Sequence, residues 1–284
     1  MNTKAPNFRQ FLDQYPTEEA CLEHLMRIRF GDRHDCSKCG RNAHFYRVKA
    51  RKVYSCEYCG NQIAPMANTP FERTRTPLRD WFHVMFLAST TRNGVAAKEV
   101  ERQLGVTYKT AWRMCHEIRK YMGDVDGNDL LGGPGKHVEI DETFIGGFRS
   151  PKTVVLGMVE RGGDVMTAVV ANQRRAALLP VMNANVIPGG AVDTDELRFY
   201  LGLTYRGHRH MTVNHSWHEY AGIDGASTNS IEGFWASVKR GINGTHVHVS
   251  AKHLPKYLAK FEYRRNMRPR PHAMLGRLMV SFAH

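Results

Sequence analysis

The stretch that decides the fold is HVEIDETF, residues 137–144. Val138 and Ile140 in this stretch are apolar, and the alternate positions Glu139 and Asp141 are acidic. Successive side chains of a strand point to opposite faces of a sheet, so this alternation predicts a strand with one buried face and one acidic face. Asp141 is therefore a candidate catalytic carboxylate, because it stands on a strand whose other face would be anchored in a core.

The segments that follow predict a mixed sheet. Further strands are expected where β-branched residues cluster, and helices where apolar residues recur at helical spacing. The expected strands are 153–160, 165–171, 191–194 and 208–215, and the expected helices are 174–186, 196–203, 229–242 and 251–267. This order indicates an α/β domain over residues 137–284, in which helices flank a mixed sheet.

The part of the chain before this domain is organised differently. Residues 123–135 are rich in Gly and Asp, so we expect a linker over residues 123–136. An N-terminal helical segment is expected over residues 1–30, where Thr17 precedes two glutamates in the manner of a helix cap.

Two CxxC pairs, Cys36 with Cys39 and Cys56 with Cys59, are separated by 16 residues, and a glycine follows each pair. Four thiolates at this spacing can close a tetrahedral zinc site, which replaces the core that a module of about 25 residues cannot supply. We therefore predict a zinc ribbon over residues 31–62 with one structural Zn²⁺. A redox dithiol and a pair of disulfides are the alternatives, and both suit a cytosolic chain poorly.

Residues 95–113 have the layout of a helix-turn-helix, inside a helical region that spans residues 75–122. A short helix over 96–104 meets Gly105, and a second helix begins after Thr107, which is placed to cap it. Early residues of the second helix of this motif normally face DNA. The candidate DNA-binding residues are Thr107, Tyr108, Lys109, Thr110 and Arg113. The alternative is an ordinary helical hairpin.

The charge of the chain points to a polyanionic partner. The net charge is +13, and the distribution is uneven: residues 1–122 carry +9, residues 123–228 carry −4 and residues 229–284 carry +8. Two basic flanks around an acidic middle favour nucleic acid over a solubilising surface charge. An anionic membrane surface is disfavoured, because no basic amphipathic helix with a large apolar face stands out.

Two more acids could join Asp141. Asp195 directly follows the expected strand 191–194, and Glu232 lies on the expected helix 229–242. Three carboxylates from separate elements can hold two Mg²⁺ ions about 3.5–4 Å apart, which is the arrangement that phosphoryl transfer on a nucleic acid needs. Asp193 is the rival to Asp195, because it has the same strand parity.

Lys239 accompanies Glu232 at a distance of nearly two helical turns. Both residues fall on the edge of the apolar stripe of their helix, so we expect them at the rim of a cleft, with Lys239 binding a DNA phosphate. The alternative is a solvated Glu/Lys pair.

At these positions the chain resembles the DDE-family transposases of bacterial insertion sequences, in particular the family numbered fifteen ninety-five, whose members carry an N-terminal zinc ribbon. The matching segments are the two CxxC pairs, RTPLRDW (75–81), LGVTYKTAWR (104–113), VEIDETFIGG (138–147), Thr194-Asp195, NSIEGFW (229–235) with Lys239, residues 244–257 and YRRN (263–266). The resemblance implies an RNase H-like catalytic domain. Its acidic positions correspond to Asp141, Asp195 and Glu232, and its helix lysine to Lys239.

We therefore expect a DNA transposase that binds the terminal inverted repeats of its element and catalyses strand cleavage and strand transfer with Mg²⁺ or Mn²⁺. Its partners would be the double-stranded DNA of the transposon ends and the target. A homodimer or higher oligomer is expected, because two ends must be cut. We expect a cytoplasmic, nucleoid-associated protein without a membrane partner, because no apolar run reaches the ~18 residues of a membrane helix. The alternatives are a catalytically inactive, transposase-derived regulator and a nuclease of the same fold.

Overall fold

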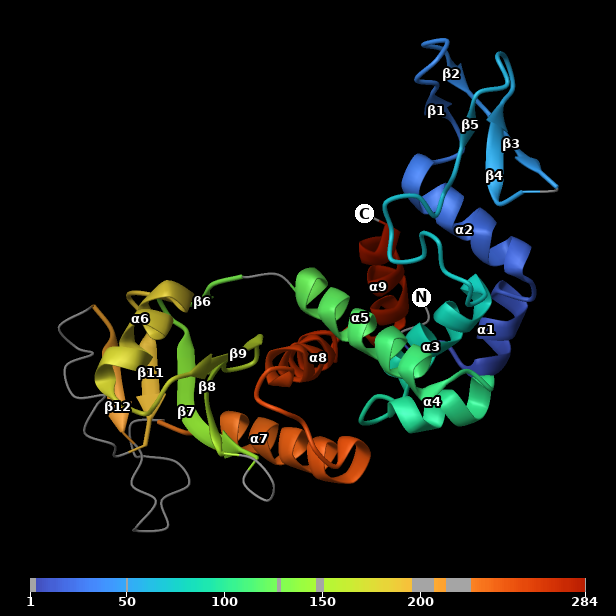
Figure 1. Ribbon diagram of the computed structural model, residues 1–284. Helices are drawn as coiled ribbons and strands as arrows, with labels where there is room; N and C mark the ends of the chain where they lie inside the picture. The colour runs from blue at the N-terminus through green and yellow to red at the C-terminus, as the bar shows by residue number, and fades with distance from the viewer. Residues whose placement is uncertain are drawn as a thin grey trace. The chain divides into compact units, whose positions relative to one another are not determined.

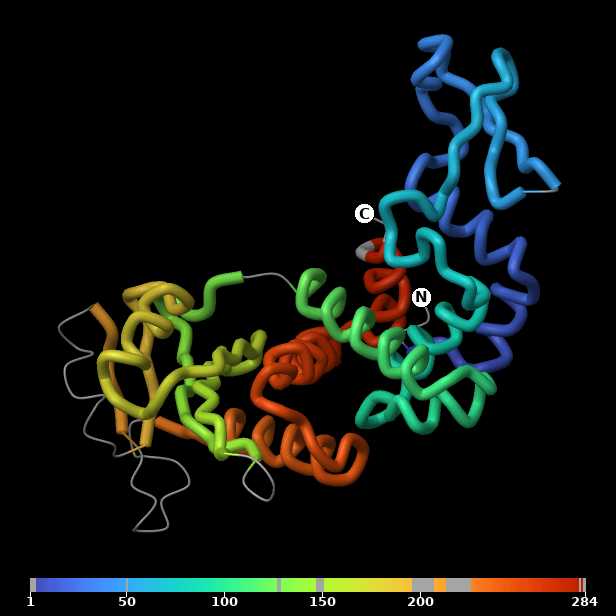
Figure 2. The backbone as a smooth tube through the Cα atoms, viewed as in Figure 1, coloured from blue at the N-terminus to red at the C-terminus, as the bar shows by residue number. Residues whose placement is uncertain are grey.

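The computed structural model describes residues 4–49, 51–126, 129–146, 151–195, 207–212 and 226–283. The chain divides into two compact units, which Figure 1 shows as ribbons and Figure 2 as a tube. The first unit comprises Met1–Tyr121 together with Arg270–His284, and the second comprises Met122–Pro269.

The second unit is built on a five-stranded sheet with the order β12-β11-β7-β8-β9. Its central strand β7 is the sequence stretch that predicted the fold, and β8 and β9 pair antiparallel beside it. On the other side, β11 runs parallel to β7, and β12 runs parallel to β11. The strands are β7 (His137–Ile145), β8 (Thr153–Glu160), β9 (Val165–Val170), β11 (Ala191–Thr194) and β12 (Arg209–Thr212).

Helices cover both faces of this sheet, so the expected α/β arrangement is confirmed (Figure 1). Val138 and Ile140 are fully buried on the face covered by α6 (Arg175–Asn185). The opposite face packs against α7 (Asn229–Gly241) and α8 (Leu254–Asn266). A π-helical turn, Ile242–His246, follows α7, and a short parallel pair joins β6 (Leu131–Gly132) to β10 (Val186–Ile187).

The first unit combines a small β module with helices. The module contains β1 (His34–Asp35), β2 (Asn42–Ala43), β3 (Phe45–Val48), β4 (Val53–Cys56) and β5 (Gln62–Ile63). The helices are α1 (Phe8–Gln14), α2 (Glu18–Phe30), α3 (Leu78–Thr90), α4 (Ala97–Leu104), α5 (Tyr108–Asp126, whose last residues enter the second unit) and α9 (Met274–Ala283). Thr17 caps α2 as expected, because its hydroxyl accepts the Ala20 N–H at 3.2 Å.

The division of the chain differs from the sequence expectation at two places. Residues 270–284 were expected to close the catalytic domain, whereas they belong to the first unit, because Phe282 is fully buried against Phe71 and Tyr121. The expected linker 123–136 begins inside a helix, since α5 continues to Asp126, and it also contains β6.

The expected helix 196–203 and the end of the expected strand 208–215 lie outside the described residues. No helix in the described part of the chain is both long enough and apolar enough to cross a membrane.

Candidate functional site

The acidic face of β7 meets the end of β11. The two strands are parallel and in a register that pairs Glu139 with Asp193 and Ile140 with Thr194. Asp141 directly follows Ile140 and Asp195 directly follows Thr194, so the two acids lie side by side at the end of this pairing. Both are half-buried. The expectation that these two acids come from neighbouring strands therefore agrees with the topology of the sheet.

Helix α7 lies across this acidic face because Gly157 leaves room for it. Gly157 is the partner of Asp141 across β7 and β8. A Cβ atom on Gly157 would come within 2.4 Å of a ring carbon of Trp235 and within 2.7 Å of the terminal carbon of Ile231. Ile231 and Trp235 belong to the predicted apolar stripe of α7, and both are buried. The stripe thus fixes α7 over the face on which Asp141 stands.

Glu232 and Lys239 project from the edge of this packed helix, and both are exposed. The Thr228 hydroxyl donates to a Glu232 carboxylate oxygen at 3.1 Å, which restrains the side chain near the start of α7. Lys239 lies seven residues further on, about 10 Å along the helix axis.

The charges of Asp195, Glu232 and Lys239 all act on Asp141. Burial, followed by the negative charge of Asp195, raises the pKa of Asp141 to about 6, and the charge of Glu232 acts in the same direction. The Glu142 N–H and the Lys239 ammonium oppose this rise. Asp141 thus shares one local field with Asp195, Glu232 and Lys239. A divalent cation fits such a donor set, because it would replace the repulsion between carboxylates with attraction.

The carboxylates are nevertheless arranged more openly than a single-ion cage. Within the described ranges, only the four ribbon cysteines bring three or more His, Cys, Asp or Glu ligand atoms together tightly enough to hold one ion. Asp141, Asp195 and Glu232 do not form a group of that kind among the described residues.

The rival acid Asp193 is engaged elsewhere. Its side chain is fully buried, and one of its oxygens accepts from the Arg161 guanidinium at 2.6 Å. Glu139, its partner across the strands, also binds Arg161. Sequence reasoning missed Arg161, because nothing local distinguishes an arginine in the turn after β8 from any other surface arginine.

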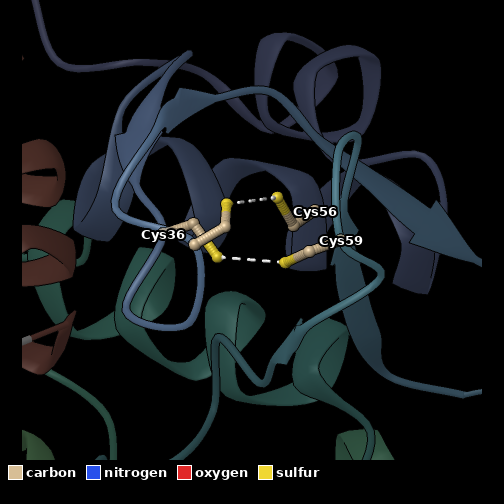
Figure 3. A group of neighbouring side chains, drawn as sticks. Cys36, Cys56 and Cys59 are labelled. Atoms are coloured by element: carbon tan, nitrogen blue, oxygen red, sulfur yellow. Dashed lines mark hydrogen bonds between the residues drawn. The ribbon is translucent and has the colours of Figure 1, made fainter.

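The four predicted zinc ligands lie together in the β module, and Figure 3 labels three of them, Cys36, Cys56 and Cys59. Their sulfur atoms are all within 4.8 Å of one another, with 3.6 Å between Cys36 and Cys59 and 4.0 Å between Cys39 and Cys56. A tetrahedron with Zn–S bonds of about 2.3 Å has edges of about 3.8 Å, so the thiols fit zinc.

Two equivalent turns hold these thiols. In each turn the glycine N–H donates to the carbonyl of the first cysteine, at 2.8 Å from Gly40 to Cys36 and at 3.1 Å from Gly60 to Cys56. Both glycines have φ near +70°, a conformation that favours glycine. The Cys39 N–H is the main cause that lowers the pKa of Cys36 to about 6, and it thereby favours the thiolate that binds a metal.

Comparison with known proteins gives the family of the chain. Residues 130–266 match the ISXO2-like transposase domain, and residues 16–62 match a transposase zinc-ribbon domain. The chain is 34% identical over 105 residues to an uncharacterized transposase-like protein of Haemophilus influenzae. The aligned segment is 36% of this chain and 80% of that protein. The chain belongs to the insertion-sequence transposase family numbered fifteen ninety-five.

A more distant relative of this transposase spans more of it. An uncharacterized protein in the transposable element ISH50 of Halobacterium salinarum is 26% identical over 254 residues, which is 80% of this chain and 82% of that protein. The matched transposase domain contains Asp141, Asp195, Glu232 and Lys239, and the matched ribbon contains all four cysteines.

The helix-turn-helix candidate of the transposase is made by α4 and α5. Gly105 ends α4 in the left-handed conformation, with φ 64°, and Thr107 caps α5 by accepting the Thr110 N–H at 3.3 Å. Tyr108, Lys109 and Arg113 are exposed along one side of α5. Thr107 is exposed as well, and Thr110 is half-buried.

The opposite side of α5 is buried, including Ala111 and Cys115. Arg113 is also tied to the unit, because its guanidinium lies 5.3 Å from the ring centre of Trp81. An exposed polar side and a buried apolar side are compatible with DNA recognition and with a plain helical hairpin, so the exposed residues remain candidates.

Proposed function

We propose that this family member is a DNA transposase in which Asp141, Asp195 and Glu232 hold two Mg²⁺ or Mn²⁺ ions in an RNase H-like domain. The observation that carries the proposal is the electrostatic coupling of these acids from two neighbouring strands and the helix laid over them. The mixed sheet flanked by helices is also the layout that the resemblance implies.

The proposed chemistry has two steps. Water attacks a phosphorus at the element end, and the P–O3′ bond breaks to leave a 3′-hydroxyl and a 5′-phosphate. The 3′-hydroxyl then attacks a target phosphodiester and releases a target 3′-hydroxyl. Bound metal ions would activate the attacking oxygen and stabilise the leaving oxygen. Asp141, Asp195 and Glu232 orient the site without forming a covalent bond to DNA, and Lys239 binds a phosphate of the end.

DNA binding is assigned to the other unit. The zinc ribbon and the exposed side of α5, with Thr107, Tyr108, Lys109, Thr110 and Arg113, would recognise the terminal inverted repeats. The charge of +9 over residues 1–122 supports this role. Two ends must be cut, so the working form would be a homodimer or higher oligomer on DNA. A protein with this activity would be found with the nucleoid.

A strand-transfer assay tests the proposal. The full chain is incubated with Mg²⁺ or Mn²⁺, a labelled duplex that carries the element end, and a plasmid target. We expect cleaved ends and ends joined to the plasmid, and we expect Asp141→Asn, Asp195→Asn and Glu232→Gln each to abolish both while the end is still bound. Cleavage without joining would indicate a nuclease, and binding without cleavage would indicate a regulator.

A further inference from the structure

A second pair of acids lies beside the proposed metal ligands. Glu139 and Asp193 face each other across β7 and β11, and they are 1% and 0% exposed. They precede Asp141 and Asp195 by two residues on each strand, which places them on the same face about 7 Å away. Two adjacent buried carboxylates lose their hydration and repel each other, so they require compensation.

Arg161 supplies that compensation. Its Nε donates to Glu139 at 3.3 Å, and a terminal nitrogen donates to Asp193 at 2.6 Å, so that one guanidinium bridges both strands. The backbone of Arg161 is fixed too, because its N–H donates to the His137 carbonyl at 2.9 Å. His137 Nδ1 also lies 3.3 Å from the Asp193 carboxylate.

The same acids hold the start of α7. The second oxygen of Glu139 accepts the N–H groups of Ser230 at 2.7 Å and of Ile231 at 3.1 Å. Asp193 accepts the Ser227 N–H at 3.4 Å. Thr228, at the N-cap position of α7, makes no side-chain cap hydrogen bond. A carboxylate from the central strand therefore takes the place of the usual cap.

The residue after Ile231 is Glu232. The hydrogen bond between Glu139 and Ile231 therefore connects two of the proposed metal ligands. One end is Glu139, two residues from Asp141 on the same strand, and the other end is the backbone next to Glu232. The connection depends on a Glu139 side-chain oxygen that faces α7, and Arg161 holds the Glu139 side chain in that orientation through the other oxygen. We propose that Arg161, acting through Glu139 and Asp193, is a positioning residue that fixes Glu232 above Asp141 and Asp195.

This inference rests on the proposed function, because it concerns the geometry of the same metal site. It also has an electrostatic signature of its own. A cation near a metal site repels the metal, so by charge alone the loss of Arg161 would strengthen metal binding. If Arg161 acts by positioning, its loss misplaces Glu232 and weakens metal binding instead. The two mechanisms thus differ in the sign of the effect.

The test measures Mn²⁺ binding to the full chain without DNA. The concentration of free Mn²⁺ is read from its electron paramagnetic resonance signal. We expect Arg161→Ala to weaken Mn²⁺ binding about tenfold or more, as is common when a group that orients metal ligands is lost. Added guanidinium at about 20 mM, far below denaturing concentrations, should restore part of the affinity, because it can enter the vacated and partly exposed position. The matched control is Arg174→Ala, an exposed arginine before α6 on the opposite face of the sheet, which should leave binding unchanged.

Glu139 gives a second test that does not depend on the folding of the Arg161 variant. Glu139→Gln keeps an oxygen that can accept the Ser230 and Ile231 N–H groups, and Glu139→Ala does not. We expect Glu139→Ala to weaken Mn²⁺ binding as much as Arg161→Ala does, and Glu139→Gln to weaken it several-fold less.

Unchanged or tighter Mn²⁺ binding in Arg161→Ala, or equal losses in the two Glu139 variants, would overturn the inference. Asp141→Asn separates this failure from that of the proposed function. Loss of binding in Asp141→Asn without an effect of Arg161→Ala rejects only the positioning role. A wild-type chain that binds no Mn²⁺ rejects the metal site itself.

Discussion

Replacing Gly157 with alanine should damage both the stability of the second unit and the proposed active site. The new Cβ would lie 2.4 Å from a Trp235 ring carbon and 2.7 Å from the end of Ile231. Carbon atoms pack at about 3.5–4.0 Å, so α7 would have to retreat by about 1 Å. Overpacking of this kind costs about 1–3 kcal/mol. For a unit of this size we expect a fall in Tm of about 2–4 °C for each kcal/mol lost.

The retreat of α7 also moves Glu232, because both clashing residues are close neighbours of Glu232 on the same helix. A misplacement of about 1 Å can reduce catalysis about 100-fold, so end cleavage by Gly157→Ala should fall by about that factor at temperatures where the protein is folded. Calorimetry and the end-cleavage assay measure the two effects.

The matched control for stability is Gly233→Ala in α7, where a new Cβ meets no atom within 4 Å. Alanine is a better helix former than glycine, so this variant should be neutral or up to about 1 kcal/mol more stable. If Gly157→Ala keeps the wild-type Tm and cleavage rate, α7 does not pack on β8 through Trp235 and Ile231, and this packing does not position Glu232.

Three further perturbations have defined outcomes. Native protein should contain one zinc per chain by elemental analysis, and zinc-free native protein would refute the ribbon site. Cys39→Ser should lose the zinc and unfold residues 31–62, while the second unit keeps its melting transition. Arg113→Ala should weaken binding to the element end by about 1–3 kcal/mol, and the loss should differ between DNA sequences if Arg113 contacts a base. Lys109→Ala should weaken binding to every DNA sequence equally if Lys109 contacts a phosphate. No loss of binding in either variant would reject the helix-turn-helix. Because burial and the Asp195 charge raise the pKa of Asp141 to about 6, Asp141 is protonated below that pH and must lose the proton to bind a metal. Mn²⁺ affinity should therefore be full above about pH 7 and fall about tenfold per pH unit below 6, and an affinity that does not change between pH 5 and 8 would contradict this.

The strands and helices of the second unit could be predicted because their signals are local. Val138 and Ile140 alternate with Glu139 and Asp141 within four residues, and the stripe of α7 repeats every three or four residues, so each segment encodes its own buried face. The cysteine pairs are equally self-contained, because ligand type and spacing are sufficient to define the site.

Long-range pairings could not be predicted from such signals. The helical pattern of residues 274–283 does not say that Phe282 packs on Phe71, because that partner lies about 200 residues away. Arg161 is similar: its position after β8 is visible in the sequence, but its two acidic partners become neighbours only after β11 pairs with β7.

The placement of α9 has a consequence for synthesis on the ribosome. The first unit is discontinuous, and Phe282 fills its core against Phe71 and Tyr121 while Tyr15 donates to the sulfur of Met279. A ribosome that adds about 5–20 residues per second needs roughly 7–30 s to pass from residue 121 to residue 270. During that interval the nascent unit lacks α9 and exposes the apolar surface on which Phe282 packs, so chaperones have a defined period in which to bind it. Chains terminated early by a nonsense codon in the second unit would lack α9, so they should be degraded rather than accumulate as a folded first unit.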